Sequence, residues 1–358
     1  MNSTRYTVLG VMSGTSLDGV DLAYIRFTKK DNWEYELLDC ETIAYESSWV
    51  VRLRDAVSQS RDALQELDLL YTEYLARLIN DFRKRHPLKD LDIIASHGHT
   101  ILHQPDQGYT YQIGNLPQLA MLCNTLVVCD FRVEDVALGG QGAPLVPIGD
   151  VLLFNNYGAC LNIGGFANIS FSENDTRIAY DICATNIVLN SLTTKLGFDF
   201  DKDGEIAASG TIDQALLHKL NELPFYKQNY PKSLGLEWVK AVVFPVLEQS
   251  GLAIEDRIAT YTEHMAVQLA HVLKNCKAIT PSNGVLVTGG GAYNTHFMQR
   301  LEELSGLKIT RAAPKMVEFK EALIFGFMGV LRLRNTINVL RSVTGASKDH
   351  CAGKLYSP

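Results

Sequence analysis

The sequence predicts an α/β fold built from two related halves, because strand-like and helix-like segments alternate and each half contains one glycine-rich hairpin. The first hairpin spans Tyr6 to Phe27, where the apolar runs YTVLGV and VDLAYIRF flank the turn-rich MSGTSLDG. The second spans Cys160 to Phe171, where CLNIGG is followed by FANISF. A chain of 358 residues is long enough for about two domains. We therefore expect two α/β halves facing a cleft.

The segments between and after the hairpins supply the helices and the remaining strands. Arg61 to His86 is predicted to form an amphipathic helix that ends at Pro87, because its apolar residues recur at helical spacing. LDIIAS and LVVCDF are apolar enough for buried strands. In the second half the same criteria predict a helix, a strand that runs into glycines, and a last helix, at 258–272, 284–290 and 318–334.

The domain boundary is predicted near Ala143 to Ile148, where the sequence GQGAPLVPI interrupts the periodicity with glycine and proline. This gives a first domain of residues 1–145 and a second of residues 146–358. The first would carry the phosphate-binding hairpin, and the second would carry the other hairpin, Asp181 and a further glycine loop. Whether the last helix packs back on the first domain is left open.

Composition excludes several classes of protein. Hydrophobic residues make up 46% and charged residues 20%, which is typical of a globular chain. The net charge of −7 argues against nucleic acid as the main partner. Seven cysteines without a C-x-x-C pair indicate reduced thiols. The longest apolar run, Ala322 to Leu331, is too short for a membrane helix, and no targeting segment is recognised, so we expect a cytoplasmic protein.

The loop of the first hairpin is the strongest candidate for an anion site. It offers successive backbone N–H groups and two hydroxyls, and its residues are Gly14, Thr15, Ser16, Leu17, Asp18, Gly19, Val20 and Asp21. It lacks the G-K-[ST] of a P-loop. Because its aspartates would repel phosphate, bound phosphate here implies Mg²⁺, with Asp18 as a candidate ligand. The alternative is a plain hairpin turn.

Two further glycine loops strengthen the nucleotide interpretation. Gly164 and Gly165 in the second hairpin fit a structural turn as well as a phosphate site. Gly289, Gly290 and Gly291, with Asn294 nearby, follow a strand and precede a helix, where a phosphate or a flat group can lie against the backbone. Three such loops in one chain favour nucleotide binding.

Asp181 ends the apolar stretch RIAYD and precedes ICATNIVLNSL, which has helical character. An acid in this place can act as a general base or as a helix N-cap, and the residues alone favour the cap. Two other signals are set aside. Asp199 to Gly204 begins like an EF-hand, but Gly210 stands where a bidentate Glu is needed. SHGHT at 96–100 has neither cysteine nor acid at zinc-ligand spacing, so a substrate-facing histidine is preferred.

At this point the ordered motifs resemble the anhydro-N-acetylmuramic acid kinase family of the actin, sugar kinase and Hsp70 superfamily. The resemblance covers nearly the whole chain, through these blocks: GVMSGTSLDGVD, SHGHTILHQP, QIG, DFRVEDVALGGQGAPLVP, LNIGGFANIS, FDKDG, VTGGGAYN and SVTGA. It implies two related ribonuclease H-like (actin/sugar kinase-type) domains around an ATP cleft. It also suggests a homodimer.

The resemblance implies that ATP and water convert 1,6-anhydro-N-acetylmuramic acid to N-acetylmuramic acid 6-phosphate and ADP. Asp181 matches the family's general base, the Gly14–Asp21 loop would hold the phosphates with Mg²⁺, and Gly289–Gly291 with Asn294 would lie beside the adenosine. His97, Arg132 and Asn186 are expected on the substrate side, with Arg132 suited to the lactyl carboxylate as a paired fork.

The sequence departs from the family pattern in two places. The usual T-G-P-G-N after the catalytic aspartate is Ile182 to Asn186 here, and the usual K-S-T-G-R-E reads KSLGLE, with Leu236 in place of arginine. Two alternatives therefore stay open: a kinase of this fold that acts on another sugar, and an ATP-binding regulator without catalysis.

Overall fold

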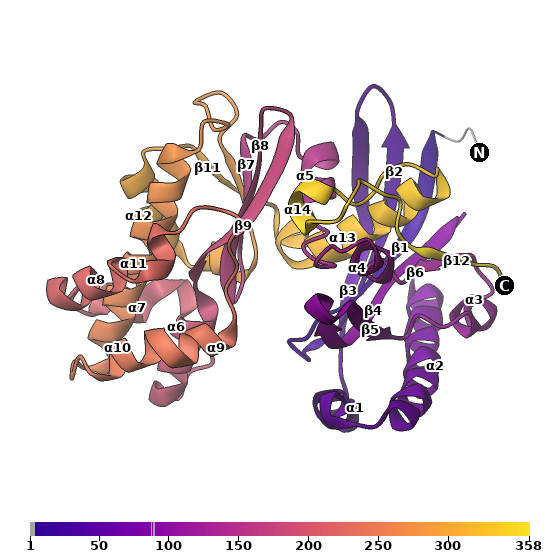
Figure 1. Ribbon diagram of the computed structural model, residues 1–358, viewed down its shortest axis with the longest axis horizontal. Helices are drawn as coiled ribbons and strands as arrows, with labels where there is room; N and C mark the ends of the chain where they lie inside the picture. The colour runs from indigo at the N-terminus through magenta and orange to yellow at the C-terminus, as the bar shows by residue number, and fades with distance from the viewer. Residues whose placement is uncertain (1–3, 87, 89) are drawn as a thin grey trace. The chain divides into compact units, whose positions relative to one another are not determined.

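The computed structural model of the protein describes residues 4–86, 88 and 90–358 (Figure 1). The predicted helix stop at Pro87 lies outside the described residues. These residues form two compact units. The first unit ends at Leu153 and resumes at Phe319, and the second runs from Phe154 to Glu318. These limits differ from the predicted 1–145 and 146–358, because the helix α5 (Pro147–Leu153) and the C-terminal segment both belong with the first unit.

The first unit contains a mixed sheet with strand order β12-β6-β4-β1-β2-β3, and β5 pairs with β4. Strands β1, β4 and β6 run parallel, whereas β2 and β3 follow β1 as antiparallel neighbours. The strands span Arg5–Ser13 (β1), Gly19–Lys29 (β2), Trp33–Ala44 (β3), Ile93–Gln104 (β4), Tyr109–Ile113 (β5), Val127–Cys129 (β6) and Lys354–Tyr356 (β12).

The second unit contains a five-stranded sheet with the order β11-β10-β7-β8-β9. Strands β7, β10 and β11 run parallel, and β8 and β9 follow β7 as antiparallel neighbours. The strands span Ala159–Ile163 (β7), Phe166–Glu173 (β8), Thr176–Ala184 (β9), Val285–Thr288 (β10) and Ile309–Arg311 (β11).

The two sheets share one topology. In each unit a hairpin and a third antiparallel strand form one side of the sheet, and two parallel strands reached through helices form the other. Read across the sheet, both units place their strands in the order third, second, first, fourth, fifth, if the added strands β5 and β12 are left aside. This is the ribonuclease H-like order, so the predicted fold class of two related α/β halves is confirmed.

Helices cover the first sheet through a buried apolar core. The helix α2 (Arg61–Arg85) buries the stripe that the sequence predicted, including Tyr71 and Phe82, against residues of β1 and β4. Its N-terminus is capped by Ser60, whose hydroxyl accepts from the Ala63 N–H. The other α-helices of this unit are α1 (Ser47–Asp55), α3 (Gln118–Cys123), α4 (Val133–Ala137), α5 and α14 (Arg341–Thr344). The helix α13 (Pro314–Leu333) begins in the second unit and continues into the first from Phe319 onward.

The second core is organised by α11 (Ile254–Asn275), which buries Ile258, Tyr261 and Met265 as predicted. Its companions are α6 (Asn186–Thr193), α7 (Glu205–Ser209), α8 (Gln214–Asn221), α9 (Leu236–Trp238), α10 (Phe244–Glu248) and α12 (Thr295–Ser305). One expectation is corrected here. Residues 182–184 belong to β9, and α6 begins only at Asn186, because the backbone of Thr185 is not helical.

Across the part of the chain that the structure describes, none of the helices combines the length and the apolar character needed to cross a bilayer.

Candidate active site

In both units the predicted glycine loops lie at the carboxyl ends of parallel strands, the edge where open α/β sheets bind ligands. In the first unit the Gly14 loop follows β1, and Arg132 follows β6. In the second unit Gly164 follows β7, and Gly289 follows β10. The sequence placed these loops along the chain, and the topology explains why the loops of each unit converge.

The loop of the first hairpin presents an exposed, polar surface. Thr15 and Ser16 are exposed, and the Ser16 hydroxyl donates to the Asp18 carboxylate at 2.6 Å. Leu17 has a left-handed backbone (φ 62°), which turns the chain back toward β2. A Cβ on Gly14 would meet only Ser16, with its hydroxyl at 3.3 Å and its backbone nitrogen at 4.0 Å; the hydroxyl ends an exposed side chain that can move, so packing within the protein does not require this glycine. The open space beside Gly14 suits the close approach of a ligand.

A buried hydrogen-bond network lies directly before this loop, at the end of β1. Ser13, the last residue of β1, lies within hydrogen-bond distance of the Tyr45 hydroxyl (2.6 Å), the Tyr71 hydroxyl (2.8 Å) and the His99 Nδ1 (2.8 Å). Burial lowers the pKa of His99 to about 4 and raises that of Tyr45 to about 12, so both side chains are neutral at pH 7. The network fixes the end of β1 without introducing a charge.

His97 and Arg132 form a pair behind this edge. The Nε of Arg132 donates to the Nε2 of His97 at 2.8 Å, which places the imidazole proton on Nδ1, where it meets the Gly98 carbonyl at 2.8 Å. Burial, with the neighbouring Arg132 charge, holds the pKa of His97 well below its usual range. The ring is buried and both nitrogens are engaged, so in this structure His97 orients Arg132.

Arg132 keeps part of its guanidinium available. Its Nη1 donates to the Gly142 carbonyl at 2.6 Å, and its plane lies over the Phe325 ring. Burial lowers its pKa to about 10, against the opposing effect of the Glu321 and Asp135 charges, so the group stays cationic at pH 7. Within the described residues Nη2 has no hydrogen-bond partner. This nitrogen can receive an anionic group.

In the second unit Asp181 lies on β9, opposite Asn168 of β8, and it is half-buried. Its Oδ2 accepts from the Leu234 N–H at 2.8 Å, and its own N–H donates to the Lys232 carbonyl at 3.2 Å. Among the described residues Oδ1 has no partner. Burial raises the pKa of this carboxyl, and the Leu234 hydrogen bond lowers it by less. The alternative of a helix cap is wrong, because Thr185 occupies the N-cap position of α6.

The segment that departs from the family pattern begins with a bulge next to Asp181. Ala167 pairs with Cys183 and Asn168 with Asp181, so Ile182 is the extra residue. The Thr185 hydroxyl donates to the Gly164 carbonyl at 2.8 Å, which joins the bulge to the second hairpin turn. The Cys183 thiol lies 3.4 Å from the Tyr226 hydroxyl in the core. Thr185 and Cys183 therefore each have a polar contact close by in this structure.

A pocket of about 480 Å³ lies wholly within the second unit. Its lining includes Asn186, Gly290 and Asn294, together with the exposed aromatic ring of Phe200. The remaining lining residues are Leu189, Asn190, Asp201, Lys202, Asp203, Gly291 and Tyr293. Asn186, which was expected on the substrate side, thus lies beside the residues expected at the adenosine.

The three glycines after β10 differ in whether the surrounding structure leaves room for a side chain. Gly289 has a left-handed backbone (φ 83°), and a Cβ there would lie 2.6 Å from the Ile163 carbonyl oxygen. A Cβ on Gly291 would lie 2.3 Å from the Ile163 side chain. A Cβ on Gly290 would meet nothing closer than the Asn186 amide, at 3.9 Å. Gly289 and Gly291 are needed by the fold, whereas Gly290 borders the open pocket.

Asn294 has a structural role as well. Its Oδ1 accepts from the Phe297 N–H at 2.9 Å and caps α12, which therefore begins four residues after Gly291. The predicted helix N-terminus directly behind the glycines is thus replaced by the 3₁₀ turn Gly290–Tyr293. Gly164 and Gly165 also supply backbone acceptors: their carbonyls receive the N–H groups of Asn186 and Ile187 at the start of α6.

A magnesium ion would fit the first hairpin by its chemistry. Asp18 presents an exposed carboxylate beside two exposed hydroxyls, and Mg²⁺ is held by one or two carboxylates together with substrate phosphates. Within the described residues no cluster of three or more His, Cys, Asp or Glu side chains suits a metal held by protein alone. A single carboxylate is consistent with an ion that arrives with its phosphate ligand.

Sequence reasoning assigned no role to several residues that the structure brings to these edges. Asp135 and Thr344 are hydrogen-bonded although 209 positions separate them, and no local pattern reveals such a pair. Phe200 was seen only as part of a motif. An exposed aromatic inside the polar segment DFDKDG was the signal that could have identified it.

Two copies of this strand order, with glycine-rich loops at the carboxyl edge of each, place the chain in the fold class of actin and the sugar kinases. The anhydro-N-acetylmuramic acid kinase family matches residues 6–358. The chain belongs to this family.

Curated relatives named anhydro-N-acetylmuramic acid kinase agree with this membership. The protein of Pseudomonas syringae pv. syringae is 36% identical over 97% of this chain and 98% of its own length. Those of Mannheimia succiniciproducens and Sulfurimonas denitrificans are 35% and 32% identical over the same shares. Among solved structures, component A of the Acidaminococcus fermentans (R)-2-hydroxyglutaryl-CoA dehydratase covers 89% of this chain and 95% of its own, with a TM-score of 0.45 at 16% identity.

Proposed function

We propose that this protein is an ATP-dependent kinase that opens 1,6-anhydro-N-acetylmuramic acid with water and phosphorylates O6, in the recycling of cell-wall amino sugars. The observation that carries the proposal is the carboxylate of Asp181. One of its oxygens is held by the Leu234 N–H, the other has no partner among the described residues, and burial raises its pKa. A fixed carboxylate with one available oxygen is the arrangement that a general base needs.

In the proposed reaction Asp181 Oδ1 takes a proton from the water that attacks the anomeric carbon. The bond from that carbon to O6 breaks, and O6 then attacks the γ-phosphoryl group of ATP. ADP leaves, and N-acetylmuramic acid 6-phosphate remains with the former bridge oxygen as its phosphoester oxygen. Burial raises the pKa of Asp181, which makes it a stronger base than an exposed carboxylate.

On the substrate side, Arg132 is proposed to bind the lactyl carboxylate. It stays cationic, and His97 and the Gly142 carbonyl fix its plane. The available Nη2 gives the carboxylate a charge-assisted donor. His97 supports this contact through Arg132. Asn186 is proposed to contact a bound substrate at the rim of the second-unit pocket.

For the nucleotide, the Gly14–Asp21 loop is proposed to receive the phosphates through its backbone N–H groups and the Thr15 and Ser16 hydroxyls. The adenosine is proposed to occupy the pocket beside Gly290 and Asn294, where Phe200 offers an aromatic surface to a flat base. Gly164 and Gly165 lie at the matching hairpin turn of the second unit.

Mg²⁺ is proposed to bind together with ATP and to neutralise the phosphate charge, with Asp18 as its protein ligand. A homodimeric state belongs to the proposal because the resemblance suggests it, and a cytoplasmic location belongs to it because the sequence offers no recognised targeting segment and no apolar run of membrane length.

The test is an ADP-release assay with Mg·ATP, with and without 1,6-anhydro-N-acetylmuramic acid. We expect turnover only with this sugar and a 6-phosphorylated product. Faster turnover with an ordinary hexose would favour the kinase of another sugar that the Ile182–Thr185 and Leu236 departures suggest. ATP binding without turnover on any sugar of a panel would favour the non-catalytic regulator.

A further inference from the structure

We infer that the C-terminal segment 344–354 holds Arg132 in its binding geometry, with Asp135 and Asp130 as positioning residues. The inference rests on the proposed role of Arg132 toward the substrate carboxylate. All residues involved belong to the first unit.

The link begins at the Gly142 carbonyl, which accepts from Arg132 Nη1 at 2.6 Å. Gly142 in turn donates its N–H to Asp135 Oδ2 at 2.7 Å. The carbonyl that aims the guanidinium is therefore held in place by the carboxylate of Asp135. No side chain is tolerated at Gly140 in between, because a Cβ there would lie 2.2 Å from Asp135 Oδ2.

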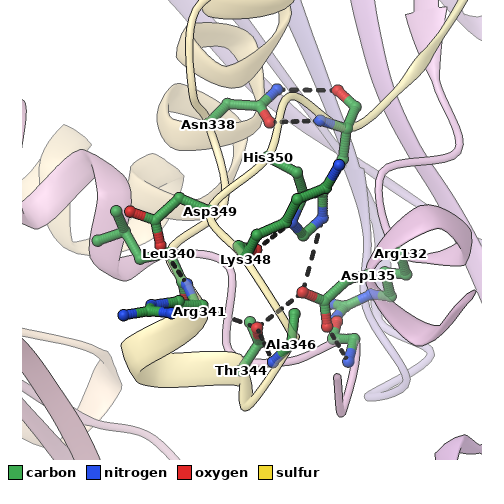
Figure 2. A network of polar contacts seen from close by, with 12 residues as sticks. Arg132, Asp135, Asn338, Leu340, Arg341, Thr344, Ala346, Lys348, Asp349 and His350 are labelled. Atoms are coloured by element: carbon green, nitrogen blue, oxygen red, sulfur yellow. Dashed lines mark hydrogen bonds and ion pairs between the residues drawn. The ribbon is translucent and has the colours of Figure 1, made fainter. Parts of the chain in front are cut away.

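Asp135 is fully buried, and two C-terminal residues engage its other oxygen. Figure 2 shows the Thr344 hydroxyl and the His350 ring pointing at this carboxylate. The Thr344 hydroxyl donates to Oδ1 at 2.7 Å, and His350 Nε2 lies 3.6 Å from the same atom. A buried carboxylate with these partners has one stable orientation, since losing a partner leaves polar atoms unsatisfied.

The segment also holds the backbone that follows Asp135. The Thr344 carbonyl accepts from the Gln141 N–H at 2.8 Å, and the Ser347 N–H donates to the Leu138 carbonyl at 3.0 Å. These contacts join the turn after α4 to the turn after α14. The loop that ends at Gly142 is thus attached to the C-terminal segment by side chain and by main chain.

The C-terminal segment also contacts Asp130, two residues before Arg132. Asp130 has a left-handed backbone (φ 60°), a conformation that costs a non-glycine residue free energy and persists where neighbours impose it. Lys354 of β12 forms an ion pair with the Asp130 carboxylate at 2.6 Å, and β12 itself pairs with β6. The C-terminal segment therefore fixes the chain at both ends of the stretch that contains Arg132.

The functional consequence follows from the geometry of arginine. A guanidinium recognises a carboxylate through donors in a rigid plane, so a small rotation lowers affinity for the charged group and spares uncharged parts of the ligand. Disturbing the network should therefore reduce the preference for a carboxylate-bearing sugar. It should leave ATP affinity unchanged.

The experiment compares kcat/KM for 1,6-anhydro-N-acetylmuramic acid with that for its methyl ester, which keeps the shape and removes the charge. Thr344→Val removes the hydroxyl at similar volume, and Thr344→Ser keeps it. We expect Thr344→Val to lower the acid-to-ester ratio about three- to fivefold, as loss of one buried hydrogen bond implies, with a normal KM for ATP. Thr344→Ser should stay within about twofold of the wild-type ratio. Asp135→Asn should lower the ratio about tenfold or more.

Arg132→Met is the reference variant, because it removes the guanidinium and should abolish the preference for the acid over the methyl ester. If it loses the ratio while folded Thr344→Val and Asp135→Asn keep it, the C-terminal segment does not position Arg132. Equal losses on acid and ester in Thr344→Val would indicate a general structural role and would also overturn the inference. A wild-type protein inactive on both sugars would overturn the proposed function, which is a separate result.

Discussion

The carboxylate of Asp181 accepts its hydrogen bond from the backbone N–H of Leu234, at 2.8 Å. Leu234 and Leu236 belong to the segment that departs from the K-S-T-G-R-E pattern of the family. Since the contact uses the main chain, replacing the side chain at position 234 does not remove it. Asp181 therefore keeps its orientation in a sequence that has changed around it.

The first prediction concerns turnover. Asp181→Asn should lower kcat by about 10²–10⁴-fold, because an amide cannot accept the proton of the attacking water. The KM for ATP should stay near the wild-type value. Steady-state ADP release measures both constants. Asp175→Asn, an equivalent change at the exposed β8–β9 turn, is the control and should retain full activity. An Asp181→Asn protein with more than half the wild-type rate would falsify the assignment of the base.

The second prediction concerns stability. Burial raises the pKa of Asp181 in the folded protein, so above that pKa the ionised carboxylate destabilises the fold relative to the unfolded chain. Asp181→Asn removes this cost, because its carbonyl oxygen can still accept from Leu234. Its melting temperature should therefore exceed the wild-type value at pH 7 to 8. The difference should shrink as the pH falls through the raised pKa. Melting curves of both proteins across pH measure it, and a variant less stable at every pH would contradict this account.

The sequence predicted the hairpins and the long helices well, because these depend on periodicities within a few residues. It could not predict the environment of Asp181, since Leu234 lies 53 residues away, nor the Asp135–Thr344 hydrogen bond across 209 residues. Long-range pairs of this kind are set by how the strands are ordered in a sheet. The bulge at Ile182 was also hidden, because a single extra residue in β9 leaves no pattern of its own.

The duplicated topology shows where the halves have diverged. Asn168 and Asp181 face each other across β8 and β9, and Asp21 and Thr42 hold the matching places on β2 and β3. The acid lies on the third strand of one unit and on the second strand of the other. In the first unit Asp21 is engaged by the Thr42 hydroxyl at 2.6 Å, whereas Asp181 keeps one oxygen available. Although the two units share a fold, their carboxylates at this place have different partners. The difference favours Asp181 over Asp21 as the general base.

The third prediction concerns magnesium. Asp18→Asn should raise the Mg²⁺ concentration for half-maximal activity several-fold, because a neutral amide is a weaker ligand for a hard cation than a carboxylate. Titration of Mg²⁺ at saturating ATP measures this. Asp31→Asn, on the other hairpin of the same unit, is the control and should match the wild type. Identical Mg²⁺ curves for all three proteins would remove Asp18 from the metal site.

The fourth prediction concerns the base of the nucleotide. Phe200 lines the pocket and Phe198 does not, although their rings are similarly exposed at 58% and 56%. Phe200→Ala should raise the Kd of ATP roughly tenfold, since stacking on an aromatic ring contributes about 1–3 kcal/mol per base. Phe198→Ala should leave the Kd unchanged, and neither change should lower the melting temperature. Calorimetric titration of ATP into each variant decides, and equal affinities would place the adenosine elsewhere.

The last prediction separates the structural glycines from the one that faces the pocket. Gly291→Ala places a methyl group 2.3 Å from the Ile163 side chain, so it should destabilise the fold by about 1–3 kcal/mol, as overpacking in a core does. Gly290→Ala meets nothing within 3.9 Å and should leave the melting temperature at or slightly above the wild-type value. Its methyl group borders the pocket, so it should raise the KM for ATP while kcat changes little. Melting curves and ATP kinetics of the two variants, measured side by side, test both halves. If Gly290→Ala bound ATP normally, the nucleotide would have to lie away from this loop, and packing against Ile163 would explain Gly289 and Gly291 without any role in binding.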